Sequence, residues 1–303
     1  MKIVVLGAGA VGLTVAAKLS RVADVHAVAR KRHADAVRER GFLMTGIWGK
    51  GAYRFSCSED LSRAWRDADY YIIAAKSTDT EAVCRQFADH IRGHEVVSLQ
   101  NGIGNEEIIG RFTDRVIGAM IITGFEWRGD ASVHVSVEAS PMRVGRFSSG
   151  TDDAVEVLVN LLRTAGIQAE TTDAIQTYLW GKTLYNCALN PLGALMNVPY
   201  GALTDPHAWA VVTTIVREAY RVVAAEGVIL PWETPEAYLE YLRTAQLPAT
   251  AAHHSSMLQD LTAGRKTEID FMNGAVAALA RKHGIDAPYN ACITELIHFR
   301  ERL

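Results

Sequence analysis

The sequence predicts an α/β protein in which a domain of alternating strands and helices is followed by an all-helical C-terminal domain. Three observations support this prediction. The β-branched run at 2–6 leads directly into a glycine-rich turn and a helical pattern. Further short apolar runs, typical of buried parallel strands, recur as far as residue 171. From there almost every segment has helical periodicity, so we expect domains at 1–172 and 173–303.

Length, charge and cysteine content exclude several classes of protein. A chain of 303 residues is long enough for two domains with a substantial core. A formal net charge of −3 gives no overall attraction for nucleic acid or for anionic membranes. No stretch approaches the ~18 apolar residues of a membrane span, and the N-terminal apolar run is too short for a signal peptide. The four cysteines form no CxxC pair, which is typical of reduced thiols rather than of a metal site. We therefore expect a cytoplasmic protein.

The first functional motif follows the N-terminal strand. It is G-x-G-x-x-G, formed by Gly7, Ala8, Gly9, Ala10, Val11 and Gly12. In this motif Gly7 makes the turn, Gly9 lets the backbone approach a pyrophosphate, and Gly12 allows close packing of helix and strand. The helix N-terminus offers free amides to the phosphates. A glycine-rich turn that binds nothing is the alternative, but the setting between strand and helix predicts a Rossmann-type dinucleotide-binding domain.

The end of the second strand, at 25–29, indicates which dinucleotide binds. NAD-specific sites usually have an acidic residue there, which hydrogen-bonds the ribose 2′-hydroxyl. This chain has Arg30, Lys31 and Arg32 instead. Cations attract a 2′-phosphate, and arginine can bind it with a bidentate fork. The sequence therefore predicts NADP(H), with Arg30 as the main phosphate ligand.

Two more strands end in polar residues. Lys76 follows the strand at 69–75, and Asn101 follows the strand that begins at Val96. Because the carboxyl ends of such strands face the ligand crevice, Lys76 is a candidate for contact with cofactor phosphate or adenosine. Asn101 is a candidate for orienting nicotinamide or substrate. The alternatives are that Lys76 caps the sheet edge and that Asn101 belongs to an Asn-Gly turn.

A polar stripe marks the start of the helical half. Lys182, Asn186 and Asn190 lie four residues apart in otherwise apolar sequence, so on a helix they share one face. This face either lines the wall of a site or faces water. Pro191 removes an amide donor and disfavours helical geometry at the preceding residue. We therefore expect the helix to end or kink at Pro191.

A second group of polar residues lies further along the chain. Ser256 and Asp260 are four residues apart and are expected to share a helix face. Glu268 follows a break at Gly264, near the start of another helix, where the helix dipole favours its negative charge. Glu268 either decorates this helix N-terminus or meets Lys182 across an interdomain cleft.

Together these motifs resemble the ketopantoate reductase family (2-dehydropantoate 2-reductase). The resemblance rests on GAGAVG at 7–12, LQNG at 99–102, K-x-x-x-N-x-x-x-N-P-L at 182–192 and SSMLQD…TEID at 255–270. It covers essentially the whole chain. It implies a Rossmann domain, an all-helical domain and an active site in the cleft between them.

The resemblance also implies roles for single residues. Lys182 matches the general acid that protonates the ketone oxygen while NADPH delivers hydride. Asn186 and Asn190 match positions that bind the hydroxyl end of the substrate. Ser256 matches a position that binds the substrate carboxylate, and Asp260, four residues later, is a further candidate for substrate binding.

The remaining matches concern the cofactor side of the site. Asn101 matches a residue that bridges cofactor and substrate, and Glu268 matches the acidic residue beside the nicotinamide. Arg30 and Lys76 match positions near the adenosine phosphate.

Two departures from the family concern the substrate pocket. The segment 118–127 replaces a Thr-rich, His-containing segment, and Tyr200 stands where well-known members have a substrate-contacting asparagine. We expect NADPH-dependent reduction of ketopantoate to pantoate. The alternatives are another 2-oxo acid, a hydroxy acid or an imine as substrate, or an NADPH-binding sensor without turnover. The apolar helical half is compatible with a homodimer and with a monomer.

Overall fold

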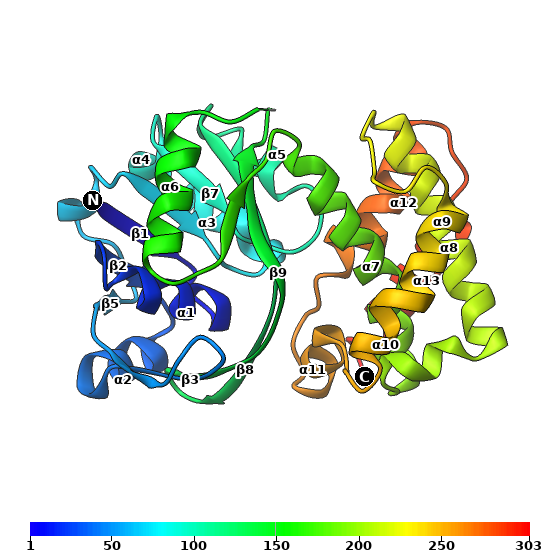
Figure 1. Cartoon of the computed structure of the whole chain (residues 1–303), viewed down its shortest axis with the longest axis horizontal. Coiled ribbons are helices and arrows are strands. Elements are labelled where there is room, and N and C mark those ends of the chain that lie inside the picture. The colour runs from blue at the N-terminus through cyan, green and yellow to red at the C-terminus, as the bar shows by residue number, and fades with distance from the viewer. Residues whose placement is uncertain (149) are drawn as a thin grey trace. The chain divides into compact units, whose positions relative to one another are not determined.

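The computed structural model describes residues 1–148 and 150–303, which divide into two compact units. Unit 1 comprises Met1–Gln100 and Asn105–Ile175, and unit 2 comprises Asn101–Gly104 and Gln176–Leu303. The colours of Figure 1 follow the chain from the strands of unit 1 to the helices of unit 2. The α/β class with an all-helical C-terminal part is thereby confirmed. The domain limits 1–172 and 173–303 stay a prediction.

Unit 1 is built around one twisted sheet. Its strands are β1 (Lys2–Leu6), β2 (Asp24–Val28), β3 (Phe42–Gly46), β4 (Gly51–Tyr53), β5 (Ser56–Ser58), β6 (Tyr70–Ile73), β7 (Glu95–Ser98), β8 (Val116–Gly129), β9 (Ser132–Arg146) and β10 (Ala169–Thr171). Its α-helices are α1 (Ala10–Leu19), α2 (Lys31–Arg40), α3 (Thr80–Gln86), α4 (Ala88–Ile91), α5 (Asn105–Ile109) and α6 (Asp153–Thr164). The strands β5-β2-β1-β6-β7-β8 are adjacent in this order and all parallel. This is the strand order of a doubly wound dinucleotide-binding sheet.

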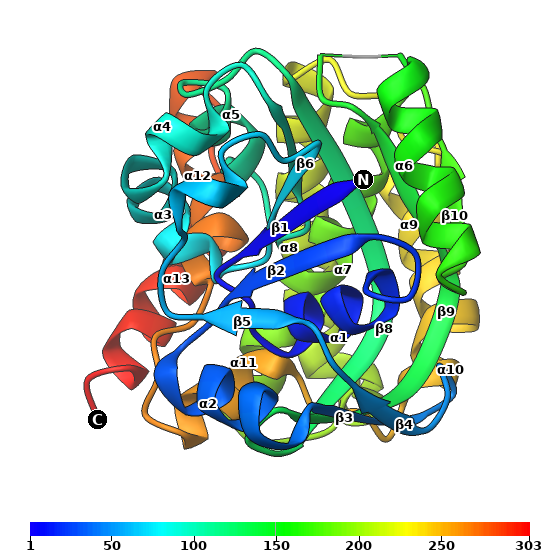
Figure 2. The ribbon, with the colours of Figure 1, turned by 90° about the vertical axis from the view of Figure 1, so that its left-hand side faces the viewer.

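Both faces of this sheet are covered. In β1, Ile3 and Val5 belong to the core that includes residues of α1 and α6. Val4 and Leu6 belong to the opposite core, beneath α3, α4 and α5. Figure 2 shows the two groups of helices on either side of the strands. A continuous apolar run such as 3–6 is what a strand buried on both faces requires, because successive side chains point to opposite faces.

Beyond β8 the sheet differs in detail from the prediction. The apolar runs at 116–123, 133–137 and 142–144 are not separate short strands but parts of the two long strands β8 and β9. These pair antiparallel with several register shifts, at which the ladder is irregular. Such irregularities break the period of two, which is why β9 reads as two separate runs in the sequence. β9 also pairs with the small antiparallel hairpin formed by β3 and β4.

Unit 2 is helical. Its α-helices are α7 (Ile175–Met196, whose first residue belongs to unit 1), α8 (Pro206–Ala225), α9 (Pro235–Tyr241), α10 (Leu247–Thr250), α11 (Ser256–Thr262), α12 (Asn273–Lys282) and α13 (Pro288–Arg300). Shorter 3-10 and π turns lie at Tyr200–Thr204, Leu242–Gln246 and Ile269–Phe271. Among the described residues, no helix is both long and apolar enough to cross a membrane.

The helix α7 continues past Pro191 to Met196, so of the two expected outcomes, an end or a kink at Pro191, the end is wrong. A proline at this position cannot donate to the carbonyl of Cys187, four residues earlier. Asn273 of α12 replaces the missing donor, since its Nδ2 donates to the Cys187 oxygen at 3.2 Å. The flanking Leu189 and Leu192 are buried, so packing also favours the continued helix.

Candidate functional site

The glycine-rich loop has the geometry of a phosphate cradle. Gly7 has φ +67°, and a Cβ there would lie 2.4 Å from the Cβ of Ala75. A Cβ at Gly12 would lie 2.8 Å from the Cβ of Ala74, so both positions require glycine. A Cβ at Gly9 would meet no described atom within 4 Å. The backbone is therefore open to a ligand at Gly9, the N-cap of α1, and this arrangement fits a pyrophosphate.

The three cations after β2 are not equivalent. Lys31 Nζ lies 2.8 Å from Asp35, and Arg32 Nε lies 3.5 Å from Asp130. Arg30 is exposed at the N-cap of α2, and no described acidic side chain pairs with it. Arg30 is thus the cation of this turn that keeps its charge available for a ligand.

A buried polar network joins the ends of β6 and β7. Gln100 Nε2 donates to the carbonyl oxygen of Ala75 at 3.0 Å and to Thr80 Oγ1 at 2.8 Å. Thr80 Oγ1 donates in turn to Asn105 Oδ1 at 2.7 Å. Lys76 lies in the connection that this network fixes, at the N-cap of a 3-10 turn. Thr80 and Asn105 carry no signal in the sequence, because only the fold brings them to the strand ends.

In unit 2 the structure brings together Lys182, Glu268 and Asn101. Lys182 is half-buried, and burial lowers its pKa to about 8 against the opposing influence of the Glu268 charge. Glu268 is 6% exposed, and Asn101 Nδ2 lies 3.5 Å from its Oε2. Glu268 precedes a 3-10 turn rather than an α-helix, and its burial argues against simple decoration of a helix end.

Asn101 reaches this group because its loop is attached to the turn after Glu268. The amide of Ile103 donates to the carbonyl oxygen of Phe271 at 2.8 Å. Gly102 has φ +84°, and a Cβ there would lie 2.2 Å from the same oxygen. The Asn-Gly pair therefore serves both as a turn and as the means of placing the Asn101 carboxamide.

The two asparagines of the stripe are buried, with exposures of 8% for Asn186 and 3% for Asn190, so the alternative of a water-facing stripe is wrong. The Tyr200 hydroxyl donates to Asn190 Oδ1 at 2.5 Å. On its other side Asn190 Nδ2 faces Met272 Sδ at 3.8 Å. The carboxamide of Asn190 is therefore held from both ends.

Ser256 and Asp260, which were expected to share a helix face, differ in burial. Ser256 is exposed, whereas Asp260, four residues later, is buried and accepts from Arg265 Nε at 3.1 Å. The serine that reaches α7 is Ser255, whose Oγ donates to the Asn190 carbonyl at 3.2 Å and accepts from the Leu258 amide. Ser255 could have been identified from the sequence as a serine N-cap, because it stands directly before a helix.

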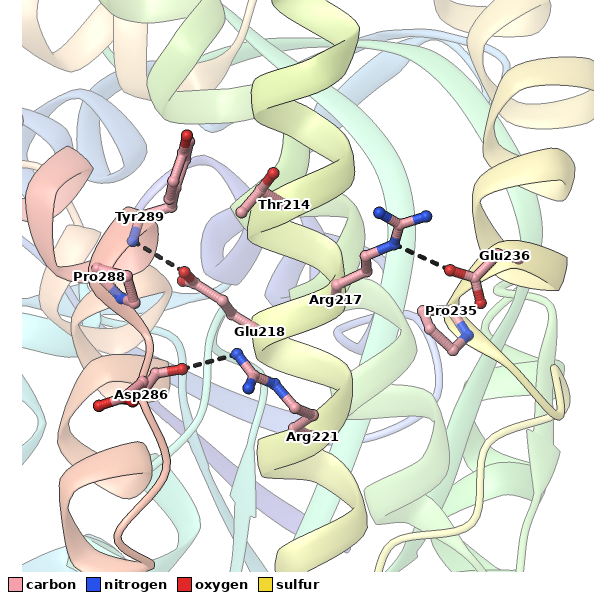
Figure 3. A pocket seen from close by; sticks show the side chains of 9 residues that line it. All are labelled: Thr214, Arg217, Glu218, Arg221, Pro235, Glu236, Asp286, Pro288 and Tyr289. Carbon is pink, nitrogen blue, oxygen red and sulfur yellow. Dashed lines mark hydrogen bonds and ion pairs between the residues drawn. The ribbon is translucent and has the colours of Figure 1, made fainter.

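A surface cavity of about 530 Å³ lies elsewhere on unit 2, between α8, α9 and the start of α13. Figure 3 shows its lining, in which Arg217 and Glu236 form an ion pair and Glu218 accepts from the Tyr289 amide. None of the site residues predicted from the sequence is among the described residues that line it. Its polar groups are engaged in joining helices.

Comparison with known proteins finds relatives that match along nearly the whole chain. Residues 3–149 match the family described as "Ketopantoate reductase PanE/ApbA", and residues 174–301 match its C-terminal part. The 2-dehydropantoate 2-reductase of Pyrococcus horikoshii is 31% identical over 313 residues, covering 100% of this chain and 98% of the relative.

Two solved structures are similar over the full length. The PanE/ApbA family ketopantoate reductase of Ralstonia eutropha JMP134 is 28% identical, with a TM-score of 0.89 and coverage of 100% of this chain and 99% of that one. A D-mandelate dehydrogenase with NADH and anilino(oxo)acetate is 26% identical, with the same TM-score and coverage. The resemblance found in the sequence is confirmed: the chain belongs to the ketopantoate reductase family of NAD(P)-dependent oxidoreductases.

Proposed function

We propose that this protein uses NADPH to reduce a small branched 2-oxo acid at C2, with 2-dehydropantoate (ketopantoate) as the first candidate substrate and pantoate as product. One observation carries the proposal. Lys182 is half-buried with its pKa lowered to about 8, and it interacts with the charge of Glu268 while Asn101 lies against that carboxylate. A primary amine in this environment is suited to proton donation near neutral pH.

Each of these side chains has a part in the proposed reaction. When bound, the reduced nicotinamide supplies the hydride. The Lys182 ammonium donates a proton to the oxygen that becomes negative, and its charge stabilises that oxygen beforehand. Glu268 opposes the loss of this proton, because its negative charge raises the pKa of the lysine. Asn101, held against Glu268 and by the anchored Gly102 turn, orients the reactants.

NADPH rather than NADH is proposed because of the turn after β2. Arg30 is exposed there without a described acidic partner, whereas Lys31 and Arg32 have Asp35 and Asp130 beside them. A free guanidinium suits a 2′-phosphate, and the residues directly after β2, 29–32, include no carboxylate that could accept from a 2′-hydroxyl.

The second candidate substrate is another 2-oxo acid, with an alkyl or aryl tail. The hydrogen bond from Tyr200 to Asn190 favours this second candidate, because it occupies the Asn190 carboxamide, a polar group of the proposed site. So does the similarity to a D-mandelate dehydrogenase that was solved with anilino(oxo)acetate.

The proposal is tested by measuring NADPH consumption from its absorbance, with ketopantoate and a panel of alkyl and aryl 2-oxo acids as substrates. Fast turnover of ketopantoate is expected, alone or together with other branched 2-oxo acids. Turnover of other 2-oxo acids alone would move the substrate to the second candidate. Binding of NADPH with no turnover of any acid would favour a sensor and refute the proposal.

A further inference from the structure

We propose that Tyr200 determines substrate specificity by withdrawing the acceptor oxygen of Asn190 from the site, so that the enzyme accepts 2-oxo acids whose tails carry no hydroxyl group. This inference rests on the proposed function, in which the polar face of α7 lines the substrate site. It concerns how the tail of the substrate is recognised, not the hydride and proton transfers at C2.

The contact itself fixes the orientation of the Asn190 carboxamide. Tyrosine has a single hydroxyl proton, and here it is directed to Asn190 Oδ1 over 2.5 Å. The amide nitrogen points toward the sulfur of Met272, a weak acceptor at 3.8 Å. Since Tyr200 and Asn190 are both only 3% exposed, water does not compete strongly for this pair. The carboxamide therefore offers its N–H donors, while its oxygen already accepts from Tyr200 with one of its two lone pairs.

Tyr200 is itself held in place. Its amide donates to the carbonyl oxygen of His253 at 3.0 Å, and its ring packs edge-on against Tyr185 at 5.8 Å. The hydroxyl of Tyr185 is directed to Thr250, so it does not compete for Asn190. Burial raises the pKa of Tyr200, which keeps its hydroxyl protonated and able to donate.

The geometry of α7 sets which residues the tail of the substrate would meet. Lys182, Asn186 and Asn190 rise by ~6 Å per step of four residues along α7, so a substrate whose carbonyl meets Lys182 extends its tail along this face. A hydroxyl on that tail needs an acceptor to compensate for lost water, and the Asn190 oxygen already accepts one hydrogen bond, from Tyr200. An alkyl or aryl tail has no such need.

The test compares two acids that differ only in this hydroxyl: ketopantoate and 2-oxo-3,3-dimethylbutanoate. We expect the wild-type enzyme to have similar kcat/KM values for the two. Tyr200→Phe keeps the ring but releases Asn190 Oδ1, and should shift the ratio roughly tenfold toward ketopantoate, mainly through KM. Tyr185→Phe is the matched control, because it removes a neighbouring tyrosine hydroxyl that does not contact Asn190, and it should leave the ratio unchanged.

The outcomes separate the two proposals. Turnover of both acids with the same ratio in wild type and Tyr200→Phe would overturn the role of Tyr200 while leaving the proposed function intact. A strong wild-type preference for ketopantoate would overturn it without any variant, which covers the case in which Tyr200→Phe does not fold. Absence of turnover with either acid, in the wild type and in both variants, would overturn the proposed function and this inference together.

Discussion

At the scale of single residues, the environment of Lys182 is the feature with the most consequence. An exposed lysine keeps its proton far above neutral pH and is a poor acid there. Burial lowers the pKa of Lys182 to about 8, and the charge of Glu268 limits this fall. The lysine is thus charged at neutral pH but able to release its proton, which is what the proposed reduction requires.

Removing this amine should abolish most of the activity. We expect Lys182→Ala to lower turnover by ~10²–10⁴-fold, as for loss of a general acid, with NADPH affinity largely retained. Steady-state kinetics and a separate NADPH titration measure the two effects. Unchanged turnover would exclude Lys182 as the proton donor.

The pH profile gives an independent check. Since the donor must be protonated, kcat/KM should fall on the alkaline side with a midpoint near the Lys182 pKa of about 8. Glu268 raises this pKa, so Glu268→Gln should move the midpoint to lower pH. A midpoint that is the same in both proteins would contradict the coupling of the two side chains.

Arg30 and Lys31 form a matched pair for testing cofactor choice. Arg30→Ala should weaken NADPH by roughly tenfold or more and NADH little, because only NADPH has the 2′-phosphate that the guanidinium would bind. Lys31→Ala should have little effect, since Lys31 is already paired with Asp35. Binding constants from fluorescence titration measure both. Equal weakening of the two cofactors by Arg30→Ala would refute the phosphate assignment.

At the scale of elements, α7 carries the proposed catalytic face through a proline. The carbonyl of Cys187 loses its usual helical donor at Pro191 and accepts instead from Asn273 of α12. Asn273 is fully buried and its Nδ2 also donates to Asn290 Oδ1 at 3.0 Å. One side chain therefore repairs α7 and joins it to two other helices.

A double-mutant cycle tests this repair. Asn273→Ala should lower the free energy of unfolding by about 1–3 kcal/mol, since it leaves buried groups without partners. In the Pro191→Ala background the cost should be smaller by about 0.5–1.5 kcal/mol, because the new amide at 191 can donate to Cys187. Urea unfolding measures each step, with the exposed Asn160→Ala as a near-neutral control. Purely additive costs would show that Asn273 does not substitute for the missing donor.

At the scale of the whole molecule, one short loop belongs to a different unit from the segments that flank it. The residues Asn101–Gly104 belong to unit 2, although the segments on both sides of them belong to unit 1. They are held by the bond from Ile103 to Phe271 and by the close approach at Gly102. This short excursion places Asn101 beside Glu268.

Two glycines of this loop allow a matched comparison. Gly102→Ala would place a Cβ 2.2 Å from the Phe271 oxygen, whereas at Gly104 the nearest atom would be 3.9 Å away. Both have positive φ, +84° and +106°, so both variants are strained. We expect Gly102→Ala to lose clearly more stability and activity than Gly104→Ala, as measured by thermal unfolding and turnover. Equal effects would show that the loop is not anchored by this contact.

The order of the elements in unit 1 could be predicted from the sequence. The run at 2–6 with Gly7, Gly9 and Gly12 predicts a strand, a turn and a helix, because these depend on local backbone geometry and on the period of the apolar residues. The Lys182 stripe was predictable for the same reason, since steps of four residues define a helix face. The cytoplasmic location stays a prediction, and the homodimer stays one of two alternatives beside the monomer.

Other features depended on contacts between residues far apart in the chain. Pro191 is a local signal for a helix end, yet the helix continues, because Asn273, which is 82 residues further on, supplies the missing donor. The burial of Ser255 rather than Ser256, and the bond from Tyr200 to Asn190, likewise depend on how the helices pack. The sequence by itself therefore determined the fold class, the glycine-rich loop and the polar face of α7, because each follows from local geometry. Only the tertiary structure decided which polar groups on that face remain available, because burial and hydrogen-bond partners are set by packing.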